Sequence, residues 1–488
     1  MAKKGIPQIR IPIRPQDLTI ELAELYLDTV FNEFCSISKQ IREDYDTYCL
    51  DHSILGKTRL HDDTDINNIV IIPDLKSMID WKTGYVFGNP IKYAQNKSSD
   101  TDDINYLNKY VRSSCQRTVD KEVGTWAYAT GVGYYFIQPK SEKFDIEVES
   151  PYEIYCRESD SCAKVYSSFV GNKPLFDLLY TSYDIINEQK VKETVQVLDI
   201  YLGEYLYTYE QRAGVGHFVR TQTQARGLGL NKVLPLVEKR PNSDGIGIVA
   251  MGKCMQDALD SLISNGLDNV EDIVNDVWIY YNIVLGDTPE KQAETHRKAK
   301  KGGAIQALAQ NEKLQPKVET LSPKLSLSEV KDMYALINET FHSTVGVPIE
   351  MSSTNSGGTT KSGSEVANGY DNAYNRALDD INTFIKADTE LLDKIMWICK
   401  NTPNNKIDKL ATSEIEIKYS LNLTDNMLTK SQSYGTFIQT MPPAMALRMC
   451  RLSNDPEAEG KLIENHMAKM KAEERAKQQT NNSNNSQE

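Results

Sequence analysis

Residues 326 to 348 read SLSEVKDMYALINETFHSTVGVP. Apolar side chains recur at steps of three and four from Leu327 to Val345, which predicts one helix with a continuous apolar face. Gly346 and Pro348 then end the helix, because glycine leaves the helical region at little cost and proline disfavours the helical conformation of the residue before it. We therefore expect the chain to turn just after Val345.

A second long helix is predicted a short distance downstream. Residues 351–363 are polar and lack apolar periodicity, whereas the helical pattern returns at Ser364 and continues to Lys400, interrupted only at Asp388. Two well-predicted helices thus flank a Gly/Ser/Thr loop. An ordinary surface connection is one interpretation of this loop. A loop presented to a ligand is the other, because both flanking helices are apolar enough to anchor its ends.

The loop does not match the pattern of a nucleotide-binding loop. That pattern places glycine directly before the Lys-Ser/Thr pair, so that backbone N–H groups wrap the phosphates. Here Lys361 and Ser362 follow Thr360, and no strand is predicted just before the loop. The spacing therefore disfavours a nucleotide site.

The composition is that of a large globular protein with an acidic balance. The chain has 488 residues, of which 40% are apolar and 25% charged, and its formal net charge is −13. This balance argues against a protein that grips nucleic acid by neutralising phosphates, but not against one that lets nucleic acid slide past. The start of the chain lacks the apolar segment of a signal peptide, and no apolar run is long enough to predict a membrane span.

Signatures of metal sites and of catalysis are missing from the sequence. The eight cysteines and six histidines are scattered, without a Cys-x-x-Cys pair, which favours reduced thiols and disfavours a zinc site. No nucleophile, base and acid stand in a pattern that predicts catalysis. We therefore expect no cofactor, no metal and no enzymatic activity of the chain itself.

A long amphipathic helix is predicted over residues 249–277. Its apolar stripe runs from Met251 through Leu259 to Val277, and about 29 residues give a length of roughly 43 Å. The opposite stripe is mostly acidic and contains Lys253, Asp257, Asp260, Asp268 and Glu271. A solvated helix face is the ordinary interpretation of such a stripe.

The remaining elements follow from local patterns. Helices are predicted at 19–48, at 74–84 with Asp74 as the N-cap, at 103–128, at 426–440 and at 444–451. Tyrosines and β-branched residues predict strands at 134–138, 144–148, 153–156, 163–169, 175–181, 194–202, 204–211 and 217–221. Further strands are predicted at 278–285, 302–308, 317–321 and 415–419. A basic cluster lies between the first two of these and consists of Arg297, Lys298, Lys300 and Lys301.

Several segments, taken in this order, resemble the portal proteins of tailed double-stranded DNA bacteriophages. They are IDWKTGYVFGNPI at 79–91, the strand after Gly131, and LPLVEKRPN at 234–242 followed by the long helix. The Gly/Ser loop before a second long helix and the terminal block 441–464, with DPEAE at 455–459, complete the series. The resemblance covers almost the whole length of the chain.

The resemblance implies an α+β portal fold whose copies assemble into a ring, usually of twelve subunits. Its parts would be a wing at 1–248, a stem helix at 249–277, a clip at 278–325, a second stem helix at 326–345, a tunnel loop at 346–363, a long wing helix at 364–402, a crown at 403–470 and a disordered tail at 471–488.

The function implied by the resemblance is a conduit at one capsid vertex, through which double-stranded DNA is packaged and ejected. Such a protein is assembled in the bacterial host cytoplasm and carried in the virion. The implied partners are further copies of the chain, DNA in transit, the terminase large subunit, a head-completion or adaptor protein, and the major capsid and scaffolding proteins, with no membrane.

The resemblance also assigns residues to roles. The DNA-facing residues of the tunnel loop would be Ser352, Ser353, Thr354, Asn355, Ser356, Thr359, Thr360 and Lys361. The acidic stripe of the long helix would line the channel and repel phosphate near the wall. The basic cluster at 297–301 would be a docking patch on the clip, although a solvated charge run is an equal interpretation.

Elementary packing agrees with a ring. Two helices with wide apolar stripes are expected to be unable to bury those stripes within one subunit, whereas neighbours in a ring bury them at large interfaces. Two hypotheses of other classes remain. A cytoplasmic enzyme acting on nucleic acid would need a carboxylate cluster or a nucleotide loop, which the sequence lacks. A helical scaffold would explain the long helices but not the tyrosine-rich strands.

Overall fold

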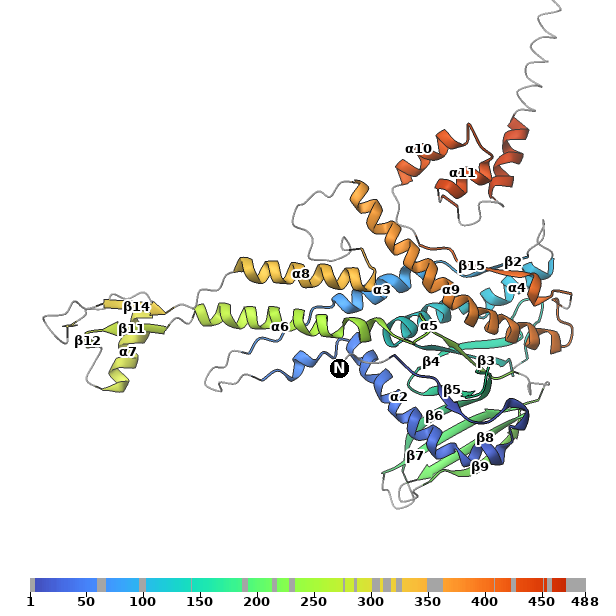
Figure 1. Ribbon diagram of the computed structural model, residues 1–488, viewed down its shortest axis with the longest axis horizontal. Coiled ribbons are helices and arrows are strands. Elements are labelled where there is room, and N and C mark those ends of the chain that lie inside the picture. Colours follow the sequence, from blue (N-terminus) through green and yellow to red (C-terminus); the bar gives the residue numbers. More distant parts are fainter. Residues whose placement is uncertain are drawn as a thin grey trace, which may run out of the picture.

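The chain folds into a body of helices and sheets from which two long helices project to a small β tip, as Figure 1 shows. Helices and strands are mixed, which confirms the expected α+β class. The computed structural model describes residues 5–58, 67–95, 102–141, 143–186, 192–212, 217–227, 233–274, 277–284, 288–300, 308–309, 317–321, 327–348, 363–407, 409–422, 427–450, 452–453 and 459–470.

A six-stranded sheet forms one end of the body. Its strand order is β1-β5-β6-β7-β8-β9, and every neighbouring pair is antiparallel except the parallel pair β1–β5. The strands span Ile9–Ile11 (β1), Cys162–Ser167 (β5), Pro174–Ile186 (β6), Lys192–Leu202 (β7), Tyr205–Arg212 (β8) and Val219–Ala225 (β9). The strands expected between residues 163 and 221 are thereby confirmed.

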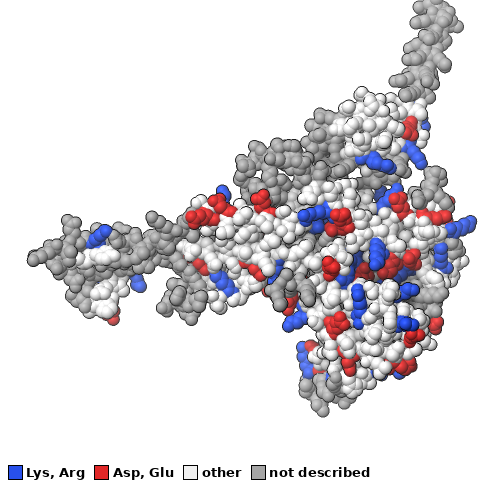
Figure 2. Space-filling view, viewed as in Figure 1, with Lys and Arg blue, Asp and Glu red and all other residues white. Residues whose placement is uncertain are grey.

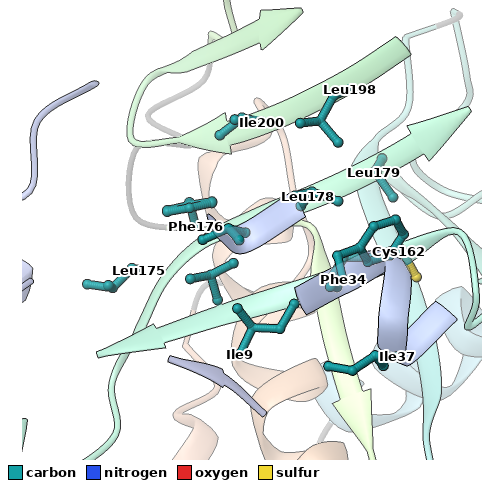
Figure 3. Packing of buried hydrophobic residues seen from close by; sticks show 14 of the residues in the cluster. Ile9, Phe34, Ile37, Cys162, Leu175, Phe176, Leu178, Leu179, Leu198 and Ile200 are labelled. Atoms are coloured by element: carbon teal, nitrogen blue, oxygen red, sulfur yellow. The ribbon is translucent and has the colours of Figure 1, made fainter. Parts of the chain in front are cut away.

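Helix α2 covers one face of this sheet. The predicted helix at 19–48 is confirmed as α1 (Ile20–Leu25) followed by α2 (Leu27–Tyr48). Figure 3 shows Phe34 and Ile37 of α2 among the aliphatic side chains of the strands, including Leu178 and Leu198. Apolar residues at steps of three and four lie on one face of α2, and alternate residues of a strand lie on one face of the sheet. These two apolar faces pack against each other and are buried together.

A smaller sheet and two helices form the centre of the body. The sheet order is β10-β3-β4, all antiparallel, with strands Leu236–Lys239 (β10), Gly133–Pro139 (β3) and Tyr152–Arg157 (β4). Helices α4 (Asp102–Ser113) and α5 (Gln116–Thr130) pack with it, together with the long helix α9 (Gly363–Asn401). Strands β2 (Lys92–Gln95) and β15 (Ile415–Lys418) pair antiparallel beside them.

Helix α9 is fixed to the centre of the body by a buried charge. The Nζ atom of Lys239, a fully buried residue of β10, lies 2.7 Å from Asp388 Oδ1 of α9. It also donates hydrogen bonds to the hydroxyls of Tyr135 (3.1 Å) and Tyr419 (3.0 Å), and it lies 4.9 Å from the centre of the Phe87 ring. A buried ammonium is costly without such partners. The polar residue that interrupts the apolar pattern of α9 therefore balances this charge.

The two projecting helices are α6 (Ile248–Val274) and α8 (Leu327–Val345), which we call the stem. At the tip, β11 (Val277–Tyr281) pairs antiparallel with β14 (Lys317–Leu321), and β12 (Ile283–Val284) pairs with β13 (Leu308–Ala309). Helix α7 (Pro289–Lys300) lies beside these strands in Figure 1. The predicted strand at 317–321 is thus confirmed. The one predicted at 278–285 is divided at Asn282, which has a φ of 53°, into β11 and β12. Most of the one at 302–308 lies outside the described residues.

Helices at the C-terminal end lie beyond α9, on the side away from the six-stranded sheet (Figure 1). They are α10 (Met427–Phe437), α11 (Pro443–Cys450) and a helix at residues 459–470. Both short helices expected at 426–440 and 444–451 are confirmed. The tail expected at 471–488 lies outside the described residues.

Three local predictions were wrong. Residues 144–148 form turns instead of a strand, because the Asp145 side chain accepts from the Glu147 N–H and its carbonyl accepts from Val148 and Glu149. The helix expected at 103–128 is broken at Cys115, which has a φ of 56°. The helix expected to end at Gly84 is α3 (Asp74–Phe87), which continues for three residues more.

Candidate functional site

The stem helices α6 and α8 pack antiparallel against each other, and a glycine sets their separation at one point. A Cβ at Gly252 would lie 2.3 Å from the ring of Phe341, so only glycine admits this ring against the backbone of α6. Further along the stem, a Cβ at Gly266 would meet Val330 at 3.9 Å, which is an ordinary contact. The two glycines of α6 are therefore not equivalent.

Alanine at these two glycines should have opposite effects on stability. Gly252→Ala should lower the free energy of unfolding by about 1–3 kcal/mol, because the added methyl group overpacks the contact with Phe341. Gly266→Ala should raise it by up to about 1 kcal/mol, because alanine favours the helix and the space is open. Urea denaturation of both variants at one protein concentration measures the difference. Equal effects of the two substitutions would contradict this packing.

An extended segment lies along the polar stripe of α6. We call residues 67–73 the strap, and Figure 1 shows the blue segment that precedes α3 running along this helix. Side chains at every fourth position of α6 accept hydrogen bonds from backbone N–H groups of the strap and of the first turn of α3. The pairs are Asp268 with Asn68 (2.7 Å), Ser264 with Val70 (3.0 Å), Asp260 with Ile72 (2.9 Å) and Gln256 with Leu75 (3.0 Å).

The spacing of the two elements explains this row, which we call the polar ladder. Four residues of an α-helix advance about 6.0 Å. Two residues of an extended chain advance about 6.6 Å and return the N–H group to the same side. The three hydrogen bonds of the strap therefore stay in register over its length, although the strap has no strand partner in the described part of the chain.

Asp260 is the most heavily engaged residue of the ladder. Its carboxylate accepts from the Ile72 N–H, from Gln256 Nε2 at 3.0 Å and from His52 Nδ1 at 2.6 Å. The side chains of His52 and Asp260 are each 1% exposed. Because a carboxylate buried away from water requires donors of this kind, Asp260 holds the strap, α6 and the segment after α2 together.

Asp268 closes the other end of the strap. Its second oxygen accepts from Lys57 Nζ at 2.7 Å, and Lys57 also donates to the carbonyl of Asn68 at 3.3 Å. Although burial raises the pKa of Asp268, the hydrogen bonds from Lys57 and Asn68 lower it below its usual value. The carboxylate is therefore ionised at neutral pH and paired inside the subunit.

The structure corrects the expectation that the acidic stripe of α6 faces a channel. Asp260 and Asp268 are buried beneath the strap, so they do not line an open surface. Asp257, which accepts from Ser53 Oγ at 2.7 Å, and Lys253, which donates to Thr47 Oγ1 at 3.0 Å, are partly exposed. Glu271 lies in the last turns of α6, and its side chain is outside the described part of the structure.

The expectation that the apolar stripes stay uncovered in one subunit is also wrong in part. Phe341 and Val345 of α8 and Leu259 of α6 are buried in the core that includes α3. Five apolar side chains nevertheless remain exposed on the stem, from 39% to 62%: Met251, Leu267, Val270, Met333 and Leu336. Figure 2 shows the face between α6 and α8 as mostly uncharged, with charged side chains at its edges.

The basic cluster of the tip is described only in part. Arg297 is exposed on α7, and Lys298 and Lys300 belong to the same helix, without a description of their side chains. Lys301 lies outside the described residues. The three described positions thus share the last turns of one helix.

The two helices on either side of the predicted tunnel loop are joined near the end of α8. After α8, Gly346 adopts a φ of 78° and the Val347 N–H donates to the carbonyl of His342 at 3.1 Å. Arg376 of α9 donates to the carbonyl of Thr344 at 3.1 Å, which joins the two helices on either side of the loop. The loop residues Ser352, Ser353, Thr354, Asn355, Ser356, Thr359, Thr360 and Lys361 lie outside the described residues.

No group of three His, Cys, Asp or Glu side chains is placed to hold a metal ion within the ranges that the structure describes. None of the helices described is both long enough and apolar enough to cross a membrane.

Comparisons with known proteins cover most of the chain. A family model described as "Phage portal protein, SPP1 Gp6-like" matches residues 27–480. Among solved structures, a chain from the "Neck of empty GTA particle computed with C6 symmetry" is similar at 12% identity, with a TM-score of 0.40, over 77% of this chain and 88% of that one. No curated protein matches the chain. The span of the family model includes the stem, the tip and α9.

Proposed function

Since the chain belongs to the family of SPP1 Gp6-like phage portal proteins, we propose that its copies close into a ring around a channel for double-stranded DNA at one capsid vertex. In this proposal the body forms the wing, α6 and α8 the stem, the β tip the clip, residues 346–363 the tunnel loop and the C-terminal helices the crown. The ring would number twelve subunits, as the sequence resemblance implies.

The observation that supports a ring best is the apolar surface that one subunit leaves exposed on the stem. Met251, Leu267 and Val270 of α6 and Met333 and Leu336 of α8 are exposed in one subunit. Scattered single apolar residues are ordinary, but five exposed on two adjacent helices leave apolar surface of the kind that interfaces cover. A closed ring covers such surfaces on every copy, because each subunit offers one surface to each of its two neighbours.

The channel wall is proposed from the polar residues of α6 that the strap leaves uncovered. Lys253 and Asp257 are the candidates among these, whereas Asp260 and Asp268 are withdrawn because the strap buries them. Glu271 stays a candidate from its place in the sequence alone. A wall of net negative charge repels phosphate over about 8 Å at physiological salt, which keeps DNA from adhering to it. The polar residues 352–361 of the tunnel loop are proposed to contact the DNA backbone without reading its sequence.

Partners are proposed by position on the subunit. The cluster Arg297, Lys298, Lys300 and Lys301 at the tip would dock the terminase large subunit or a head-completion or adaptor protein, because a basic surface favours acidic partners. The body would contact the capsid and scaffolding proteins. The energy for packaging would come from the terminase motor, with no catalysis by the chain itself.

Substitution in the tunnel loop separates transport from assembly. Replacing residues 356–360 with glutamates should leave ring formation unchanged and should reduce DNA packaging or retention, because added negative charge opposes the phosphates in the channel. Packaged DNA per particle and the mass of the purified ring are measured on the same variant. Replacement of the same residues with serine is the control for loss of the native side chains. Loss of the ring itself would show that the loop is structural.

A further inference from the structure

A groove beside α9 has no role in the channel proposed above. It consists of two adjoining hollows of about 720 Å³ and about 630 Å³, and Pro174 and Glu390 line both. We call the first the apolar hollow and the second the basic hollow. Each has the volume of an ordinary ligand site. The groove lies where α9 meets the first strands of the six-stranded sheet, away from the stem and the tip.

The apolar hollow is walled mainly by large apolar side chains: Leu18, Leu175, Leu202, Val233, Leu234 and Trp397. Figure 3 shows Leu175 at the margin of the hydrophobic cluster, apart from the side chains packed at its centre. The buried cation on the wall, Lys394, already donates to the carbonyl of Leu236 at 2.6 Å and to Glu390 at 2.9 Å. The hollow is therefore suited to an apolar side chain, and the exposed Asp393 on its lining disfavours a further carboxylate there.

The basic hollow has the opposite character. Arg10, Lys173 and Lys386 are exposed on its lining, and none of them has a carboxylate partner among the described residues. Three cations without counter-ions are unusual on a chain whose net charge is −13. They create a local positive field that favours acidic groups of a ligand.

The two carboxylates on the lining do not cancel this field, because other side chains already neutralise them. Glu238 accepts from Tyr166 at 2.7 Å and pairs with Arg240. Glu390 pairs with Lys164 and Lys394. Although burial raises the pKa of Glu390, those two ammonium groups lower it to about 2, so this carboxylate stays ionised and paired.

The length of the groove indicates an extended ligand. Its lining on α9 runs from Thr383 in the basic hollow to Trp397 in the apolar hollow. Fourteen residues of helix correspond to roughly 21 Å. An extended peptide covers this distance with about six or seven residues.

We propose that this groove binds an extended segment of another protein, with acidic residues seated in the basic hollow and an apolar side chain in the apolar hollow. Charge complementarity favours this occupant, since the free cations lie at one end only, and the mainly apolar wall with its exposed Asp393 lies at the other. The proposal does not depend on ring formation or on the DNA channel. It assigns to the wing a separate surface for recruiting a partner.

The test is binding of defined peptides to the purified full-length protein by fluorescence anisotropy. One probe carries three aspartates, then glycine and serine, then two leucines, and a second carries the same residues in reverse order. At least one of them should bind more tightly than about 1 mM, the weak end of specific affinity. Replacing the leucines of the better probe with serine should weaken its binding, because the apolar hollow is then left empty.

Variants of the protein locate the site. The double substitution Lys173→Glu, Lys386→Glu should weaken binding by about tenfold or more, because it reverses the field of the basic hollow. The matched control Lys39→Glu, Lys121→Glu makes the same change in charge at exposed residues outside both hollows and should leave binding unchanged. Leu18→Ser, with its melting temperature measured beside it, tests the apolar hollow.

Three results would overturn the proposal. The first is that neither peptide binds, or that both pairs of substitutions weaken binding equally. The second is that a single-stranded oligonucleotide binds and displaces the peptide, which would make the groove a nucleic-acid site. The third is that Lys173→Glu, Lys386→Glu abolishes the ring, which would make the groove a contact between copies of the chain.

Discussion

Replacing Asp388 with alanine should lower the free energy of unfolding by about 3–5 kcal/mol, because it leaves the ammonium of Lys239 buried without its counter-ion. The 2.7 Å ion pair would be lost, together with the acceptor for the Tyr419 hydroxyl. Aromatic rings and two tyrosine hydroxyls would still surround Lys239, and they compensate only in part. Urea denaturation followed by circular dichroism measures the change.

The control for Asp388→Ala is an ion pair on the surface. Glu147 lies 3.2 Å from Lys406, and their side chains are 66% and 35% exposed. Glu147→Ala should cost less than about 1 kcal/mol, because water already solvates both charges. The two variants are compared at equal protein concentration, since assembly raises apparent stability by mass action. Equal losses in both would mean that the buried pair does not hold α9 in place.

Replacing Asp260 with alanine should detach the strap from α6. The substitution removes the acceptor for the Ile72 N–H, for Gln256 and for His52, and unpaired buried donors cost about 1–3 kcal/mol each. Amide exchange should therefore accelerate by at least about tenfold at Asn68, Val70 and Ile72, because exchange reports local opening. Hydrogen–deuterium exchange with peptide-level or amide-level resolution measures it directly.

Asp257→Ala is the matched control for Asp260→Ala. Asp257 is one turn away on the same helix, is partly exposed and accepts from Ser53 at 2.7 Å. Its loss should leave exchange in the strap unchanged. If Asp257→Ala accelerates exchange as much as Asp260→Ala, or if neither does, the polar ladder does not hold the strap.

The long helices were predictable from the sequence because each carries its own periodic pattern. The apolar residues of α8 and α9 recur at helical spacing within each segment, so the pattern can be recognised without knowing what the helix packs against. Gly346 marks the end of α8, because it adopts the left-handed conformation that only glycine adopts at little cost. The break at Cys115 had a weaker signal. Ser113 and Ser114, just before it, bond their hydroxyls back to the carbonyls of Tyr110 and Val111 instead of extending the helix.

The role of the polar stripe was not predictable from α6 alone. An acidic stripe opposite an apolar one is typical of a solvated face, and nothing within α6 distinguishes Asp257, which is partly exposed, from Asp260, which is buried. The distinction comes from a segment about 190 residues earlier, whose backbone N–H groups lack a strand partner. The signal in the sequence is a pair of matching repeats. Polar side chains at every fourth position of a helix can bind the N–H groups at every second position of an extended segment.

In the sequence, buried charges are visible only as interruptions of an apolar pattern. Asp388 breaks the apolar periodicity of α9, and Lys239 is the last residue of β10. Because 149 residues separate them in the sequence, the sequence alone does not show that they pair. A lone charge within an apolar pattern predicts that a partner of opposite sign exists, because burial without one is costly. The identity of that partner depends on the fold.

The mass and image of the purified full-length protein test the central claim most directly. The stem leaves Met251, Leu267, Val270, Met333 and Leu336 exposed, so copies of the chain should associate through these helices at micromolar concentration. Electron microscopy and native mass spectrometry of the same sample should show a closed ring with a central opening. A chain that stays monomeric under these conditions, or associates without an opening, would contradict the account.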